Sequence, residues 1–170
     1  MRLHPRGLNL CAKEKPPTPV SNFCIQYEVY DKSNDKSLSE NLVFTLLFDV
    51  EGNLWVGTAN GLNKLDDKSD SFTRFYKEDS NANSLSDNEI YALYQDSLGD
   101  LWIGTLRGLN KLELETGNFT QYTSKDKKII NDWIFSISER DDKGLWVATY
   151  GGLTHLDPKT MTSRFYDVSD

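Results

Sequence analysis

Two aspartates stand where acid–base chemistry would first be sought. Asp49 and Asp96 each lie three residues before a glycine and six before a tryptophan. A catalytic pair of carboxylates must occupy one special place in a fold, whereas these two recur at the same place in similar stretches. An aspartate followed by a glycine is typical of a tight turn, because the carboxylate accepts backbone N–H groups and glycine adopts positive φ. We therefore predict two turn caps and no catalytic residue.

The residue types that hold metals or cofactors lack the spacing that such sites need. The two cysteines, Cys11 and Cys24, and the two histidines, His4 and His155, form no zinc-ligand pattern. We interpret the cysteines as unpaired or incidentally paired thiols and expect His155 to be exposed on a strand. The sequence holds no glycine-rich phosphate loop, metal-binding helix or nucleophile motif. It predicts no metal and no cofactor.

Composition narrows the class of protein further. The 170 residues carry a net charge of −7, and 12% of them are aromatic. That aromatic content is too high for a low-complexity disordered chain. The negative charge repels phosphate backbones, so we expect no nucleic-acid partner. No apolar run reaches the roughly 18 residues that a membrane-spanning helix needs.

A repeat dominates the chain after residue 40. Three segments read Leu-Trp-Val/Ile-Gly/Ala-Thr, then two variable residues, a glycine and a Leu-x-x-Leu stretch. Their tryptophans are 47 and then 44 residues apart, at Trp55, Trp102 and Trp146. Units of about 40–50 residues built from short strands are typical of β-propeller blades. Since tryptophan buries a large apolar area, we place all three in the core between blades.

Each unit predicts four short strands. An apolar run precedes the aspartate turn, and the Leu-Trp strand follows it. A second turn ends at a glycine, and two further strands complete the unit. That glycine is Gly61, Gly108 or Gly152. The third unit departs from the pattern, because Arg140 stands where the others have aspartate. We expect a turn of altered length over residues 141–144.

The expected fold is all-β: a β-propeller fragment of three four-stranded antiparallel blades plus one orphan outer strand. The blades cover residues 42–88, 89–131 and 132–170. Residues 23–41 supply the outer strand of a preceding blade and its linker, because 25–30 and 37–41 echo 72–76 and 84–88. Three prolines favour a disordered linker or truncated leader over residues 1–22. Propellers close with about 4–8 blades, so we expect the missing blades in a parent protein.

The variable residues of the repeat are expected on one face. In an up-and-down blade, the turn after the tryptophan strand and the linker before the first strand lie at the same end. Recognition residues lie on such loops, so the candidates for ligand binding are Asn60, Asn88, Arg107, Trp133 and Tyr150. Arg107 suits a carboxylate or sulfate, and the two aromatic residues suit stacking on a sugar ring. The alternative is that all five are ordinary turn residues.

Two stretches carry a family resemblance. Asp96-x-x-Gly-Asp-Leu-Trp-Ile-Gly-Thr-x-x-Gly-Leu-Asn-Lys-Leu112 and Asp79-Ser-Asn-Ala-Asn-Ser-Leu-Ser86 resemble the two-component regulator propeller family. The resemblance extends over residues 25–166. It implies the periplasmic or extracellular sensor of a membrane-anchored bacterial signalling receptor. It also implies partners outside this chain: a downstream histidine kinase or cyclic-dinucleotide synthase.

We therefore expect a non-catalytic sensor of a carbohydrate or other small polar ligand, with a homodimer as one arrangement. Two alternatives stay open. A propeller scaffold that docks a protein partner would use the same broad face. A sialidase-like glycoside hydrolase has a similar Asp-to-Trp hairpin, although this sequence has one extra residue between aspartate and glycine and no arginine cluster.

Overall fold

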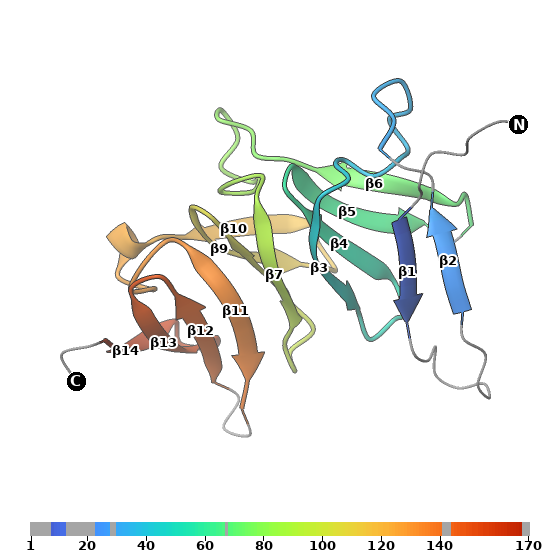
Figure 1. Cartoon of the computed structure of the whole chain (residues 1–170). Helices are drawn as coiled ribbons and strands as arrows, with labels where there is room; N and C mark the ends of the chain where they lie inside the picture. Colours follow the sequence, from blue (N-terminus) through green and yellow to red (C-terminus); the bar gives the residue numbers. More distant parts are fainter. Residues whose placement is uncertain (1–7, 13–22, 28–29, 67, 141–143, 168–170) are drawn as a thin grey trace, which may run out of the picture.

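A computed structural model describes residues 8–12, 23–27, 30–66, 68–140 and 144–167 (Figure 1). In chain order its elements are β1 (Leu8–Ala12), β2 (Phe23–Tyr27), β3 (Val43–Phe48), β4 (Leu54–Thr58), β5 (Gly61–Asp66), β6 (Ser71–Phe75), β7 (Ile90–Gln95), β8 (Leu101–Thr105), β9 (Gly108–Glu113), β10 (Asn118–Tyr122), the 3₁₀ helix η1 (Ser124–Asp126), β11 (Ile134–Glu139), β12 (Leu145–Thr149), β13 (Gly152–Asp157) and β14 (Thr162–Tyr166).

Twelve of the described strands form three four-stranded antiparallel sheets. The sheets are β3-β4-β5-β6, β7-β8-β9-β10 and β11-β12-β13-β14, so each is an up-and-down meander in chain order. We call them blades 1, 2 and 3. The first strands β3, β7 and β11 lie next to one another (Figure 1). The predicted all-β class and the three four-stranded blades are confirmed.

The apolar core lies between the blades. Trp55 of β4 is buried in one cluster with Leu85, Ile90 and Leu93 of blade 2 and the linker before it. Trp102 of β8 occupies the equivalent place between blades 2 and 3. In blades 1 and 2 the tryptophan therefore fills the space between two sheets. Trp146 of blade 3, predicted in the same kind of core, is only half-buried and belongs to none of these clusters, because no further described sheet packs on that side of blade 3.

Glycine in the tryptophan strand permits the close approach of the next blade. A Cβ atom built on Gly104 would lie 2.6 Å from Cγ2 of Ile134, which begins the first strand of blade 3. The same atom on Gly57 would lie 2.7 Å from Cγ2 of Ile90. Both distances are shorter than any side chain tolerates, so only glycine fits without a shift of the neighbouring blade.

The repeated aspartates close the first turn of blades 1 and 2. Oδ1 of Asp49 accepts the backbone N–H groups of Glu51 and Asn53 at 3.0 and 2.8 Å. Its Oδ2 accepts the indole N–H of Trp55 at 3.0 Å. Burial alone would raise the pKa of Asp49, but the hydrogen bonds from Asn53, Trp55 and Glu51 outweigh it and lower the pKa.

Blade 3 replaces this arrangement. Arg140 stands at the aspartate position, and the turn expected at residues 141–144 lies largely outside the described residues. The ring of Trp146 stacks on that of His155, with centroids 4.7 Å apart. The expectation that His155 is exposed was wrong: the side chain is half-buried because the indole face covers it.

The linkers before blades 1 and 2 are each fixed to their blade by a buried polar network. In blade 2, Ser86 donates its backbone N–H to Oδ1 of Asn110 at 2.8 Å, and the Asn110 amide returns a bond to Ser86 Oγ at 2.9 Å. The Ser86 hydroxyl also bonds Thr105 Oγ1 at 3.0 Å. Ser39, Thr58 and Asn63 make the same bonds in blade 1. Fully satisfied networks of this kind hold loops in one conformation.

The N-terminal segment differs from the expected linker and orphan strand. The segment expected to be a linker, 1–22, contains the strand β1. β1 pairs antiparallel with β2, which covers part of the strand expected at 25–30. The outer strand therefore has a partner within the chain. The physical reason is local: Leu8-Asn9-Leu10 alternates apolar and polar residues, which suits a strand.

The helical content of the described residues is limited to η1, in the linker before blade 3. No helix in the described ranges is both long and apolar enough to cross a membrane.

Candidate ligand-binding site

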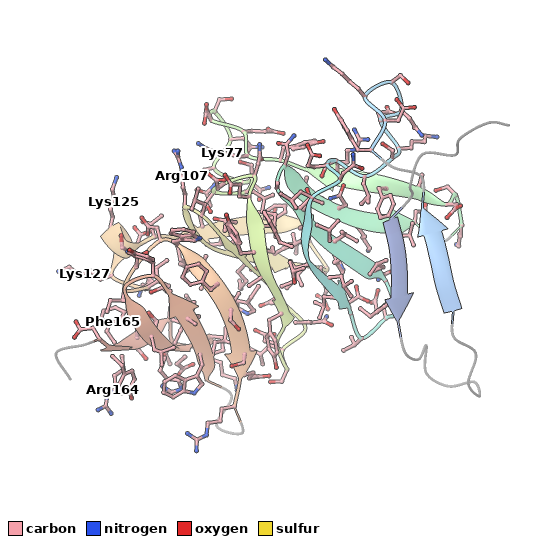
Figure 2. All side chains as sticks on the ribbon, viewed as in Figure 1. Lys77, Arg107, Lys125, Lys127, Arg164 and Phe165 are labelled. Atoms are coloured by element: carbon pink, nitrogen blue, oxygen red, sulfur yellow. The ribbon has the colours of Figure 1, made fainter. Side chains whose placement is uncertain are left out.

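The turns after the tryptophan strands and the linkers before the first strands meet at one end of the blades. In blade 2, the N–H of Leu106 donates to the carbonyl of Glu89 at 3.3 Å, and in blade 3 that of Tyr150 donates to Trp133 at 3.0 Å. Arg107 in a turn and Lys77 and Lys125 in linkers lie at this same end (Figure 2). The shared face inferred from topology is therefore present. We call it the rim: it consists of the turns β4–β5, β8–β9 and β12–β13 and the linkers before β3, β7 and β11.

Aromatic rings form a continuous row at the rim. Trp133 stacks on Tyr150, with centroids 5.5 Å apart and an interplanar angle of 15°. Trp133 also contacts Phe135 at 5.0 Å and Tyr91 at 6.2 Å. Tyr91 in turn stacks on Phe44 at 4.8 Å. The row thus crosses three blades. Its rings offer faces and edges on which a flat ligand can stack.

Much of this row is accessible. Tyr150 is 73% exposed, Phe135 44% and Phe44 38%. Trp133 is half-buried among Tyr91, Phe135 and Tyr150. Its indole Nε1 is buried with no hydrogen-bond acceptor among the described residues. Exposed aromatic rings arranged side by side are uncommon away from binding surfaces.

A backbone irregularity places three of these rings. Phe44, Tyr91 and Phe135 occupy equivalent positions in β3, β7 and β11, and each lies where the pairing with the next strand shifts register. Such a bulge re-aims one side chain out of the regular alternation. Sequence reasoning treated these residues as ordinary members of the apolar first strand and missed them. The available signal was an aromatic residue at the second position of all three strands.

Polar groups surround the row. The hydroxyl of Tyr91 donates to Oε2 of Glu89 at 2.7 Å. This hydrogen bond, with burial and the charges of Glu89 and Asp87, raises the pKa of Tyr91 to about 12. Asp87 also forms an ion pair with Nε of Arg107 at 3.2 Å. Tyr91 therefore keeps its proton to a more alkaline pH than an ordinary tyrosine, and Arg107 has a carboxylate partner.

The five candidates from sequence form three groups. Trp133 and Tyr150 are stacked, and Asn88 donates its side-chain amide to Oδ1 of Asn60 at 3.3 Å. Arg107 stands apart with Asp87. The second turn of each blade, which carries some of these candidates, ends at a glycine of positive φ. Gly61, Gly108 and Gly152 have φ between 121° and 145°, as that turn requires.

Within the described ranges, no three His, Cys, Asp or Glu side chains gather in a way that would hold a metal ion. Asp49 and Asp96 use both carboxylate oxygens in turn and indole hydrogen bonds.

The fold defines a segment of a β-propeller, made of consecutive blades stacked face to face. Residues 37–60 and 84–107 match the two component regulator propeller family, so the chain carries repeats of that family, as the sequence indicated. Both matches run from the linker serines to the second turn of blades 1 and 2. Blade 3 lies outside them, and it has Ile130, Arg140 and Ala148 where blade 2 has serine, aspartate and glycine.

Solved structures support the fold. The extracellular domain of BT3049 from B. thetaiotaomicron, described as a hybrid two component system, aligns with a TM-score of 0.76 and 22% identity, over 88% of this chain and 21% of that one. The extracellular domain of BT4673 from the same organism, described as a one component system, gives 0.69 and 22%, over 85% and 21%. This chain therefore spans about a fifth of their length.

A similar likeness extends to an enzyme. Catalytically inactive virginiamycin B lyase from Staphylococcus aureus, solved with quinupristin, aligns with a TM-score of 0.61 and 14% identity, over 88% of this chain and 46% of that one. At such identities the likeness concerns the fold alone. No curated protein matches the sequence.

Proposed function

We propose that this chain is a non-catalytic, ligand-sensing segment of the extracellular propeller of a bacterial two-component receptor, and that the rim binds a carbohydrate. The family repeats and the similar extracellular domains support the receptor assignment. A kinase or cyclase output would then belong to other domains of the parent protein.

The observation that carries the ligand class is the row of rings between Phe44 and Tyr150. Sugar rings present flat faces of C–H groups that pack on aromatic rings, and their hydroxyls need hydrogen-bond acceptors and donors at the edge. Glu89, Asn60 and Asn88 lie in the adjoining linkers and turn and supply such groups.

The carboxylates beside the rings favour a neutral ligand over an acidic one. The arginine that suits a carboxylate or sulfate is already paired with Asp87. Glu89 adds a further negative charge beside Tyr91. An anionic sugar would meet these carboxylates, whereas a neutral oligosaccharide would not.

The experiment is a binding titration of the 170-residue chain, followed by tryptophan fluorescence, with neutral cello-, xylo-, manno- and malto-oligosaccharides and with oligogalacturonate as the acidic arm. We expect saturable binding of a neutral sugar that Tyr150→Ala weakens at least about tenfold, the loss of one stacking contact. Phe165→Ala is the control, because this aromatic residue of β14 lies away from the rim (Figure 2).

Several outcomes would overturn the carbohydrate assignment. One is the absence of binding to every sugar, and another is binding that Tyr150→Ala leaves unchanged. A protein that co-purifies with the parent ectodomain through the rim, with no sugar bound, would favour the scaffold function instead.

A further inference from the structure

The hairpin β1–β2 has the register of the outer half of a blade. Leu8 pairs with Tyr27 and Asn9 with Gln26. In blade 1, Leu62 pairs with Phe75 and Asn63 with Arg74. In blade 2 the matching pairs are Leu109 with Tyr122 and Asn110 with Gln121.

The sequence around β1 supports the equivalence. Arg6-Gly7-Leu8-Asn9 is identical to Arg107-Gly108-Leu109-Asn110, which crosses the second turn of blade 2 and enters β9. We infer that β1 and β2 are the third and fourth strands of another blade. Its first and second strands are not among the described residues, in which β1 pairs with β2 alone.

A second observation concerns the exposed side of β3. Leu46 is 45% exposed and Phe48 44%. The equivalent of Leu46 in blade 2 is Leu93, which is 9% exposed and packs in one cluster with Trp55 and Leu62 of blade 1. The side of β3 that carries Leu46 therefore corresponds to the side of β7 that blade 1 covers.

The exposure is confined to the innermost strand. Leu54, Val56 and Leu65, on the next two strands of blade 1, are between 0 and 4% exposed. They form a cluster with Leu38 and Phe72. An inner apolar strip beside covered outer strands is what a blade lacking only its two inner strands would leave.

We propose that a two-stranded hairpin of this same repeat docks here, with its tryptophan strand paired to β1 and its apolar face on Leu46 and Phe48. The hairpin belongs to the parent polypeptide outside residues 1–170. The interface between blades 1 and 2 is the template: β4 pairs with β5 and supplies Trp55 to the cluster around Leu93. Edge pairing also removes the unpaired strand edge of β1, which otherwise invites association.

The test adds that hairpin to the chain. Residues 42–60, a copy of β3, β4 and the turn between β4 and β5, are joined directly to Gly7, so that the new junction reads Thr-Ala-Asn-Gly as at Thr58–Gly61. We expect the amides of β1 and β2 to exchange with solvent at least about tenfold more slowly than in the 1–170 chain, and the urea midpoint to rise. The matched control carries the same 19 residues in scrambled order.

A second variant keeps the proposal falsifiable. Leu46→Asp in β3, not in the added copy, should leave the stability of the 1–170 chain nearly unchanged, because the side chain is already exposed there. In the extended chain the same substitution should remove most of the gain in protection and in urea midpoint. Equal protection by the scrambled extension would overturn the proposal, as would a gain that Leu46→Asp does not reduce. A 1–170 chain that dimerises through β3, with dimerisation abolished by Leu46→Asp, would show that a second copy occupies the surface instead. The sugar titration is independent of all these results.

Discussion

The indole Nε1 of Trp102 donates a hydrogen bond to Oδ2 of Asp96 at 2.7 Å, and both side chains are buried. The aspartate therefore closes its turn with one oxygen and orients the tryptophan of the blade interface with the other. Asp96, which with Asp49 recurs at the same place of the repeat, is therefore a structural link between a surface turn and the core.

Removal of this carboxylate should destabilise the chain. Asp96→Ala leaves the buried indole N–H and the backbone N–H groups of Leu98 and Asp100 without their acceptor. We expect the free energy of unfolding in urea to fall by about 2–3 kcal/mol, the cost of unsatisfied donors to a charged group. Glu115→Ala, at an exposed carboxylate, should change it by less than about 0.5 kcal/mol. Equal losses in the two variants would refute the assigned role of Asp96.

Asp49 should give the stability a dependence on acid pH. Its pKa in the folded chain lies below the ordinary 3.8. The stability that this carboxylate contributes is therefore complete above the unfolded pKa and is lost as the pH falls through the folded one, because the unfolded chain takes up the proton first. Urea unfolding from pH 6 down to about 2.5 should show this loss. Asp49→Asn should flatten the curve at its acid end; identical slopes in both proteins would contradict the prediction.

Gly104 should tolerate no larger side chain. Gly104→Val brings methyl groups against Ile134, where a Cβ atom alone would already lie 2.6 Å from Cγ2. We expect a loss of about 2–3 kcal/mol in the free energy of unfolding, typical of overpacking. Ala148→Gly, which removes a side chain at the equivalent position of blade 3, should lower the free energy of unfolding by no more than about 1 kcal/mol. A stable Gly104→Val protein would mean that blades 2 and 3 are not packed as described.

Tyr91 should titrate above the other tyrosines. The hydrogen bond to Glu89 and the nearby carboxylates raise its pKa to about 12 from an ordinary 10.0. In an ultraviolet titration of the folded chain, Tyr91→Phe should remove absorbance change from the most alkaline part of the curve. Since the unfolded phenol ionises first, the hydrogen bond's stabilisation is present below pH 10 and is lost as the pH rises further. If Tyr91→Phe instead removes absorbance change near pH 10, Glu89 does not raise the pKa of Tyr91 in solution.

The sequence allowed much of the framework to be predicted because its determinants are local. Asp49 and Gly52 close a turn through atoms a few residues apart, and the period of Trp55, Trp102 and Trp146 reflects one supersecondary unit repeated. The strand expected at 25–30 was found in part, but its partner β1 was missed, because Pro16, Pro17 and Pro19 between the two strands suggested a linker.

The aromatic residues of the rim could be predicted only in part. Variation between otherwise similar turns and linkers predicts Trp133 and Tyr150 as binding residues, and the structure stacks their rings on one another. The sequence does not predict Phe44, Tyr91 and Phe135 at the rim, because a bulge cannot be distinguished from regular alternation in a short apolar run.

The sequence by itself determined the repeat, its turns and the strands between them, since hydrogen bonds within a turn and alternation along a strand depend on near neighbours. Only the tertiary structure decided that rings from three blades form one row and that β3 keeps an apolar side uncovered. Both depend on how separate sheets approach one another, which is set by packing between residues some 45 positions apart rather than by local chemistry.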